Sequence, residues 1–173
     1  MRADAQRNRQ RILEAAETVF AEQGSSASTE DVAELAGVAI GTVFRHFPTK
    51  KDLLQAIMKN LMARLAARAS TEGDLFEFFD YFVAEAAAKK TVIELLADVG
   101  LGVEVADSVQ QFREAVAELL GAARKAGTVR PEVQVDVVLA LLTATSQGAL
   151  RAGWDADLRR RTLEIIYTGL RPT

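Results

Sequence analysis

Residues 37–50 read GVAIGTVFRHFPTK, and this stretch decides how the N-terminal third of the chain is interpreted. Two glycines stand four residues apart, Arg45 and His46 lie between two phenylalanines, and Pro48 closes the segment. A helix buried on all sides would not place arginine beside aromatic residues, and a solvated surface helix would not need phenylalanine on both sides of Arg-His. The pattern therefore favours a short helix with one core face and one face that meets a partner.

The flanking residues predict a second short helix just before this one. Thr29 is the candidate N-cap of a helix that ends at Ala36, with acidic residues in its first turn, where the helix dipole favours them. Gly37 supplies the positive φ of a tight turn, and Ile40 to Phe47 form the next helix, which Pro48 terminates. Two short helices joined by such a turn are typical of a helix-turn-helix, whose second helix lies in the DNA major groove.

Side chains of the two short helices separate into a packed set and a free set. The packing positions between the helices are Val32, Ala33, Ala36, Val38 and Val43, and Phe47 is also assigned to the core. Gly41 has no side chain, so it would let the start of the second helix approach a phosphate closely. Thr42, Phe44, Arg45 and His46 are then free to face the groove and its walls.

Helical periodicity continues through nearly the whole chain and predicts an all-α fold of about nine helices. A first helix spans about 5–23, and Thr49 with Asp52 forms the capping box of a fourth helix that runs to about Arg68. The polar stretch Ser70–Asp74 is the clearest break. Five further helices are expected at about 75–89, 91–99, 108–125, 133–152 and 155–170. The expected domains are 1–51 for DNA binding and 52–173 for a helical ligand-binding and dimerisation domain.

Composition limits the classes of protein to which the chain can belong. The 173 residues include no cysteine, so disulfides, thiolate metal sites and a cysteine nucleophile are excluded. Residues 1–51 carry seven cations and seven anions, whereas residues 52–173 carry the whole net charge of −3. The cations of the first part fall into two clusters, at residues 2–11 and 45–51, and charge alone favours solvated surface for both. No apolar run reaches the roughly 18 residues of a membrane span, and no signal peptide is apparent, so we expect a cytoplasmic protein.

Three segments together resemble the DNA-binding domain of the TetR family of bacterial transcriptional regulators. They are RILEAAETVFAEQG at 11–24, Thr29 with DVAELAGV at 31–38, and GTVFRHFPTKKDLL at 41–54. The resemblance implies a homodimer that binds a roughly palindromic operator in double-stranded DNA. It also implies C-terminal helices that form a ligand pocket and a dimer interface, with repression relieved by a small-molecule effector.

The same resemblance indicates which residues face DNA. Carried over position by position, they are Thr29, Ala39, Ile40, Gly41, Thr42, Phe44, Arg45, His46 and Lys50. The family often has serine at position 39 and tyrosine at position 44, so a hydroxyl is missing at each, at a cost of about 1 kcal/mol apiece. Arg45 suits bidentate contact with guanine but could equally bind phosphate, and His46 could be a packed residue or a phosphate contact.

Candidate residues in the C-terminal part come from apolar stripes. The predicted pocket consists of Phe79, Phe82, Leu95, Val99, Phe112, Val116 and Leu142, with Thr143 or Gln147 as polar members, although ordinary core packing explains such residues as well. The predicted dimer interface consists of Ala144, Gly148, Ala152, Leu158, Ile165, Ile166 and Gly169 on the last two helices. Burial within one subunit is the alternative explanation for this second set.

Two other functions compete with the DNA-binding regulator. An enzyme is disfavoured because the chain has no cysteine, one histidine on the predicted DNA face, no phosphate-binding glycine loop and no carboxylate cluster with metal-ligand spacing. No metal site or cofactor is therefore expected. A helical adaptor that uses its N-terminal domain on a protein partner stays open, as does a DNA-binding regulator without a small-molecule inducer.

Overall fold

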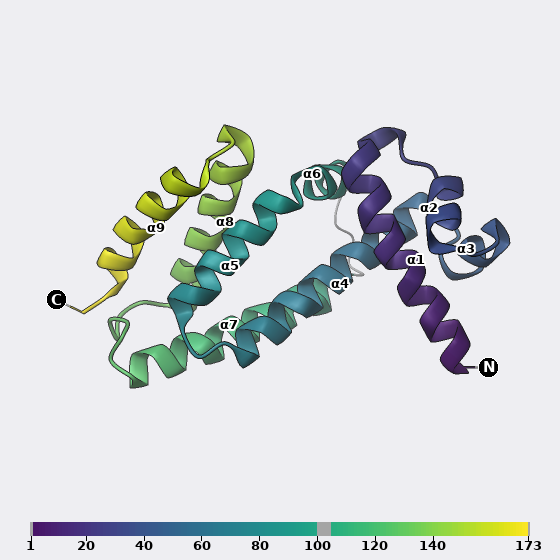
Figure 1. Ribbon diagram of the computed structural model, residues 1–173. Helices are drawn as coiled ribbons and strands as arrows, with labels where there is room; N and C mark the ends of the chain where they lie inside the picture. Colours follow the sequence, from purple (N-terminus) through teal and green to yellow (C-terminus); the bar gives the residue numbers. More distant parts are fainter. Residues whose placement is uncertain (1, 100–104, 173) are drawn as a thin grey trace. The chain divides into compact units, whose positions relative to one another are not determined.

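The computed structural model describes the backbone of residues 2–99 and 105–172, and within them it is all-helical, with no strand. In chain order the elements are α1 (Arg2–Gln23), the short 3-10 helix η1 (Gly24–Ser26), α2 (Thr29–Ala36), α3 (Ile40–His46), α4 (Lys50–Thr71), α5 (Leu75–Ala88), α6 (Lys90–Val99), α7 (Ala106–Lys125), α8 (Val135–Ala152) and α9 (Ala156–Leu170) (Figure 1). The all-α prediction with about nine helices is confirmed.

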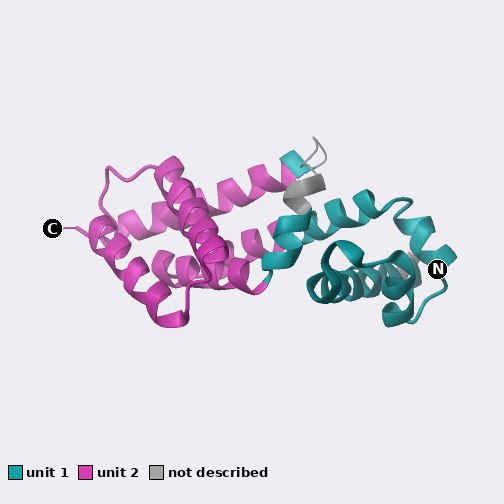
Figure 2. Ribbon diagram, turned by 90° about the horizontal axis from the view of Figure 1, so that it is seen from above, with its two compact units in different colours: residues 1–61, 89–106 teal, residues 62–88, 107–173 magenta. Residues whose placement is uncertain are grey.

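The helices pack into two compact units (Figure 2). Unit 1 comprises Met1–Leu61 with Lys89–Ala106, and unit 2 comprises Met62–Ala88 with Asp107–Thr173. Helix α4 is continuous and contributes residues to both units. Packing therefore assigns the first half of α4 and all of α6 to the unit that holds the N-terminal helices, whereas the functional boundary expected after residue 51 stays a prediction.

Unit 1 is built around the apolar faces of its N-terminal helices. Ile12, Ala16 and Phe20 recur along α1 with helical spacing and are fully buried, as is Val32 of α2 and Val43 of α3. Helix α1 packs against α2, α3 and α6. Burial of these side chains fixes α2 and α3 on α1, so that the opposite face of the two short helices is left to solvent.

A polar junction in unit 1 joins α1, α4 and the turn residue just before α6. The Glu17 carboxylate of α1 accepts a hydrogen bond from Asn60 Nδ2 of α4 at 3.4 Å and forms an ion pair with Lys89 Nζ at 2.9 Å. Both charged side chains are largely shielded from water, so this pair is held more firmly than an ordinary surface ion pair. The junction ties the start of α6 to the same unit as α1.

Unit 2 is a bundle in which α5 packs against α8 and α9. The Tyr167 hydroxyl of α9 lies 2.9 Å from Asp80 Oδ1 and 3.1 Å from the Phe76 carbonyl oxygen of α5. Burial, reinforced by the Asp80 carboxylate, raises the pKa of Tyr167 above its ordinary value. The phenol therefore stays protonated and acts as the hydrogen-bond donor that links α9 to α5.

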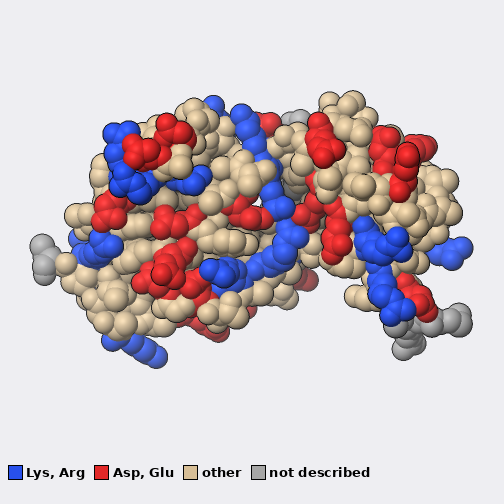
Figure 3. Space-filling model, viewed as in Figure 1, with Lys and Arg blue, Asp and Glu red and all other residues tan. Residues whose placement is uncertain are grey.

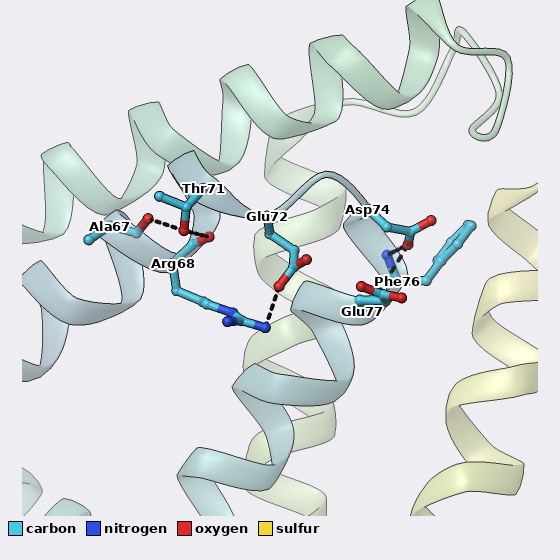
Figure 4. Close-up of polar contacts among 7 residues, drawn as sticks. All are labelled: Ala67, Arg68, Thr71, Glu72, Asp74, Phe76 and Glu77. Carbon is cyan, nitrogen blue, oxygen red and sulfur yellow. Dashed lines mark hydrogen bonds and ion pairs between the residues drawn. The ribbon is translucent and has the colours of Figure 1, made fainter.

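The polar stretch Ser70–Asp74 covers the end of α4 and the turn that leads into α5 (Figure 4), and it lies wholly in unit 2. Thr71 Oγ1 donates to the carbonyl oxygens of Ala67 and Arg68, and Arg68 forms an ion pair with Glu72. Asp74 Oδ1 accepts from the backbone N–H groups of Phe76 at 2.7 Å and Glu77 at 3.1 Å. Asp74 is thus the N-cap of α5, and the stretch separates two helices rather than two units.

Candidate nucleic-acid interface

Helix α2 starts with a capping box made by Ser28 and Asp31. Ser28 has extended backbone angles, its Oγ accepts from the Asp31 N–H at 3.1 Å, and the Asp31 carboxylate accepts from the Ser28 N–H at 3.1 Å. The prediction that Thr29 is the N-cap is therefore wrong by one residue. Thr29 lies in the first helical turn because an acid stands three positions after Ser28, whereas the residue three positions after Thr29 is Val32.

The turn between α2 and α3 depends on Gly37. Its φ is +63°, and its N–H donates to the carbonyl oxygen of Glu34 at 3.0 Å, while the Val38 N–H donates to that of Ala33 at 3.0 Å. This pairing satisfies the last carbonyls of α2 and reverses the chain into α3. The predicted positive φ is confirmed, and a Cβ at this position would also lie 2.9 Å from the Arg11 guanidinium.

Helix α3 presents one buried face and one exposed face. Val43 and the C-cap residue Phe47 are buried, as predicted, and anchor the helix on unit 1. Phe44 keeps 44% of its surface exposed, Ile40 is also exposed, and Arg45 is exposed without a hydrogen bond or ion pair to any described residue. Phe44, Ile40 and Arg45 therefore keep side-chain surface that packing within the chain does not cover.

Other predicted DNA-facing positions lie on the same short segment. Ala39 is the N-cap of α3 and makes no side-chain hydrogen bond, as its methyl group dictates. Nothing lies within 4 Å of the place where a Cβ on Gly41 would stand, so packing within the chain does not require glycine there. Thr42 and His46 are half-buried.

Lys50 occupies a position that the sequence did not suggest. Its Nζ donates to the carbonyl oxygens of Ser25 at 2.9 Å and Ala27 at 2.8 Å, and it lies 5.3 Å from the centre of the Phe20 ring. The predicted capping box of Thr49 and Asp52 is present beside it, with Asp52 N donating to Thr49 Oγ1 at 3.1 Å and Thr49 N donating to Asp52 Oδ2 at 2.9 Å.

Arginines from α1 support this region, and sequence reasoning did not assign them that role. The Arg9 guanidinium lies 5.3 Å from the centre of the Phe47 ring, and the Arg11 guanidinium lies beside Gly37. Phe47 and Gly37 lie more than twenty residues later in the chain, so these contacts were not visible in the sequence. On the face shown in Figure 3, basic and acidic side chains are interspersed. An anionic partner would therefore be attracted by individual groups of cations rather than by a uniformly basic surface.

The predicted effector-pocket residues divide between two clusters on α5. Phe82 stacks on Phe112 of α7 at 5.6 Å between ring centres, with Phe78 6.2 Å from Phe82 and 6.3 Å from Phe112. Phe79 instead meets Tyr167 of α9 edge-on at 5.8 Å. Phe79 and Phe82 therefore belong to different aromatic clusters, because these two residues of α5 face different neighbours.

The remaining pocket candidates are also dispersed. Val116 and Leu142 are fully buried in unit 2, whereas Leu95 belongs to unit 1, and the side chain of Val99 lies outside the described residues. Thr143 and Gln147 are exposed on α8. A residue that sequence reasoning missed is Ser146, which is only 5% exposed and whose hydroxyl has no partner among the described residues.

The predicted dimer-interface residues are mostly exposed in the single chain. Ile165 is 75% exposed, and Ala144, Ala152, Leu158 and Gly169 are exposed as well, while Ile166 is half-buried. Gly148 is different, because a Cβ there would lie 2.9 Å from the Trp154 ring of the same chain. The small residue at 148 therefore makes room for Trp154.

Two kinds of feature are absent from the described residues. No group of three or more histidine, cysteine or carboxylate side chains in the described part of the chain is arranged to hold a metal ion. Among the same residues, no helix has both the length and the apolar character that crossing a membrane requires.

Comparison with known families and proteins assigns the chain. Residues 12–57 match the family described as bacterial regulatory proteins, tetR family, and residues 70–172 match the family described as transcriptional regulator SbtR-like, C-terminal domain. A TetR transcription regulatory protein from Mycobacterium vanbaalenii has a similar structure, with 37% identity, a TM-score of 0.79 and 99% of each chain covered.

Curated regulators are similar at lower identity. The chain is 28% identical to the HTH-type transcriptional regulator UidR of Escherichia coli over 92% of this chain and 88% of UidR. It is 26% identical to the HTH-type transcriptional repressor KstR2 of Mycobacterium tuberculosis over 81% of this chain and 78% of KstR2. Members of this family are DNA-binding regulators rather than enzymes. The chain belongs to the TetR family of bacterial transcriptional regulators.

Proposed function

We propose that this regulator is a homodimeric repressor that binds a palindromic operator through α3 and leaves it when a small, mostly apolar molecule binds unit 2. The observation that carries the proposal is the outer face of α3, where Ile40, Phe44 and Arg45 are exposed while Val43 and Phe47 anchor the helix. The exposed apolar surface of Ile40 and Phe44 is costly to leave in water, and a DNA groove provides a surface that covers it.

The DNA-facing set within this proposal is Thr29, Ala39, Ile40, Gly41, Thr42, Phe44, Arg45 and His46. Arg45 is the base-reading residue, because guanidinium pairs bidentately with guanine in the major groove and no described residue competes for it. Gly41 has no side chain and the space beside it is open, so the backbone of DNA can approach α3 closely there. The remaining members contact phosphate and sugar and set the position of α3.

A second copy of the chain is the partner for the exposed apolar residues of α8 and α9. Leu158, Ile165 and Gly169 follow one another along α9 with helical spacing, and Ile165 is the most exposed large apolar side chain described. Solvated apolar stripes of this kind mark interaction sites. A twofold dimer places two α3 helices in successive major grooves, which lie about 34–36 Å apart.

Repression and its release rest on two further observations. KstR2, which is similar over most of this chain, is a transcriptional repressor by name. In unit 2, the cluster of Phe78, Phe82 and Phe112 contains one ring, Phe82, that is only half-buried, so an apolar ligand could bind there by displacing few contacts. A ligand changes operator affinity only by binding the DNA-competent and DNA-incompetent states unequally, and α4, which contributes to both units, is the element that would carry this difference.

Selection from a randomised duplex library, followed by mobility shift with the enriched DNA, tests the DNA-binding proposal. We expect enrichment of an inverted repeat whose half-sites are separated by one helical turn. Enrichment of single, unpaired sites, or of no sequence at all, would contradict it.

Sedimentation at micromolar concentration tests the dimer. Ile165→Lys should yield monomers, because the interface would then bury two unpaired charges, one from each subunit. Val109→Lys is the matched control, since Val109 is also an exposed apolar residue of unit 2 but lies on α7. Equal behaviour of the two variants would place the interface elsewhere.

Thermal-shift screening with apolar compounds tests the effector. A compound that raises the melting temperature should also weaken the mobility shift, and Phe82→Ala should reduce its affinity more than Phe79→Ala does, because the two rings lie in different clusters. A hit whose affinity is insensitive to Phe82 would place the effector site outside this cluster, and a regulator without an inducer would give no hit.

A further inference from the structure

The first turn of α4 carries two adjacent lysines, Lys50 and Lys51, whose side chains have different surroundings. Lys50 is half-buried, and its ammonium donates to the backbone carbonyl oxygens of Ser25 at 2.9 Å and Ala27 at 2.8 Å. Lys51 is exposed and makes no hydrogen bond or ion pair with any residue in the described part of the chain. The two cations therefore have different availability for an external anion.

Three contacts hold the Lys50 ammonium inside unit 1. An ammonium has three N–H donors, and two of them are directed at the carbonyls of Ser25 within η1 and of Ala27 just after it. The same nitrogen lies 5.3 Å from the centre of the fully buried Phe20 ring, which adds a cation–π attraction. Moving Lys50 to a phosphate would leave the Ala27 carbonyl, on a buried residue, without its charged partner.

The segment that Lys50 holds leads directly into the start of α2. Ala27 is buried, its N–H donates to the Gly24 carbonyl oxygen at 3.2 Å, and the next residue is the capping residue Ser28. Lys50 thus connects the start of α4 to the turn that sets where α2 begins. A side chain in this position determines the placement of Thr29 and its neighbours without touching DNA itself.

Lys51 lacks any comparable compensation. It lies in the first turn of α4, where the helix dipole disfavours a cation, and the one acidic residue of that turn, Asp52, is engaged in the capping box with Thr49. A phosphate group would supply the missing negative charge. The segment Phe47–Thr49 is all that separates α4 from α3, so this cation lies close in the chain to the exposed face of α3.

We propose that Lys50 is a positioning residue that fixes the segment before α2, and that Lys51 is the lysine of α4 that contacts operator phosphate. This assignment rests on the proposed operator binding and reverses the one that the family resemblance implies for Lys50. Each phosphate contact by a cation contributes about one to the slope of log affinity against log salt concentration. A positioning residue contributes affinity without contributing to that slope.

The test compares Lys50→Met and Lys51→Met on the duplex that selection enriches for the wild-type protein. Methionine keeps an unbranched apolar stem and removes the ammonium, and Lys125→Met of unit 2 is the control for loss of one positive charge. Affinity is measured over a series of salt concentrations, at a temperature where circular dichroism shows every variant to be folded. Amide hydrogen exchange of the free proteins is followed at Ala27, whose N–H is hydrogen-bonded.

For Lys51→Met we expect a slope that is shallower by about one for each bound subunit, with wild-type exchange at Ala27. For Lys50→Met we expect the wild-type slope, affinity lower by about tenfold at every salt concentration, and faster exchange at Ala27. A shallower slope for Lys50→Met, or unchanged affinity, overturns the positioning role of Lys50. A wild-type slope for Lys51→Met overturns its phosphate contact. Failure of the selection itself would instead count against operator binding.

Discussion

Phe44 of unit 1 and Phe78 of unit 2 have opposite environments. In unit 1, Phe44 stands on the outer face of α3 with nearly half of its surface in water. In unit 2, Phe78 is fully buried on α5 and contacts Phe82 and Phe112. Nearly half of the first ring is left uncovered and available for a partner, whereas the second ring is enclosed by the bundle. Exposure on the outer face of α3 therefore supports the proposed binding surface in unit 1, whereas burial in unit 2 does not distinguish core residues from pocket residues.

The largest expected effect tests this contrast directly. Phe78→Ala should lower the free energy of unfolding by about 3–5 kcal/mol, because it removes a buried ring and leaves a cavity between α5 and α7. Phe44→Ala should change it by about 0.5 kcal/mol or less and should weaken operator binding instead. Urea denaturation and mobility shift of both variants provide the measurements. A large stability loss for Phe44→Ala would remove the distinction between the two rings.

Arg45→Ala should show the next largest effect, and only in DNA binding. If Arg45 reads a base, the variant loses about 1–3 kcal/mol of binding free energy at one operator position in each half-site and no longer discriminates there. Affinities for a panel of single-base operator variants measure this. Arg160→Ala, an exposed arginine of α9, is the control and should bind as wild type. A uniform loss over the whole panel would make Arg45 a phosphate contact.

Ser28→Ala should destabilise unit 1 by about 0.5–2 kcal/mol, because the first N–H groups of α2 lose their acceptor. The adjacent change Thr29→Ala should have a smaller effect on unfolding, since Thr29 lies within the helix and caps nothing. Its expected effect is on operator affinity. Chemical denaturation of the two variants ranks them, and an equal loss of stability would mean that the cap is shared.

The smallest expected effect is that of a methyl group at position 41, which should change stability and operator affinity in opposite directions. Gly41→Ala should raise the free energy of unfolding by up to about 1 kcal/mol, because alanine favours helix and the space beside position 41 is open. The same methyl group should weaken operator binding if α3 approaches DNA closely there. A variant that is more stable and binds equally well would place the contact surface away from Gly41.

The contrast between the units also explains what could be predicted from the sequence. The helix-turn-helix was predictable because local signals determine it. Gly37 adopts the positive φ of the turn, and Thr49 and Asp52 form the capping box of α4. Val43 and Phe47 supply the apolar face that buries α3. The N-cap of α2 was assigned to Thr29 instead of Ser28, although the spacing of Ser28 and Asp31 indicates a capping box.

In unit 2 the determining contacts join residues far apart in the chain. Nothing local indicates that Phe79 meets Tyr167 while Phe82 meets Phe112, since both choices fit the same apolar helix pattern. The position of the Lys50 ammonium was hidden for a related reason, because its carbonyl acceptors lie in a segment more than twenty residues earlier. Pocket and core residues have the same chemistry, so burial alone does not separate them either.

The fit of Trp154 against Gly148 gives the molecule an internal optical reporter. Trp154 is the one tryptophan among the 173 residues, it is half-buried, and it belongs to unit 2. Its emission therefore follows the corner between α8 and α9 without a dye, whereas unit 1 contributes no indole signal. A shift of emission wavelength upon dilution would report separation of two chains at this face, and emission that stays constant while helicity falls would show that unit 1 melts first.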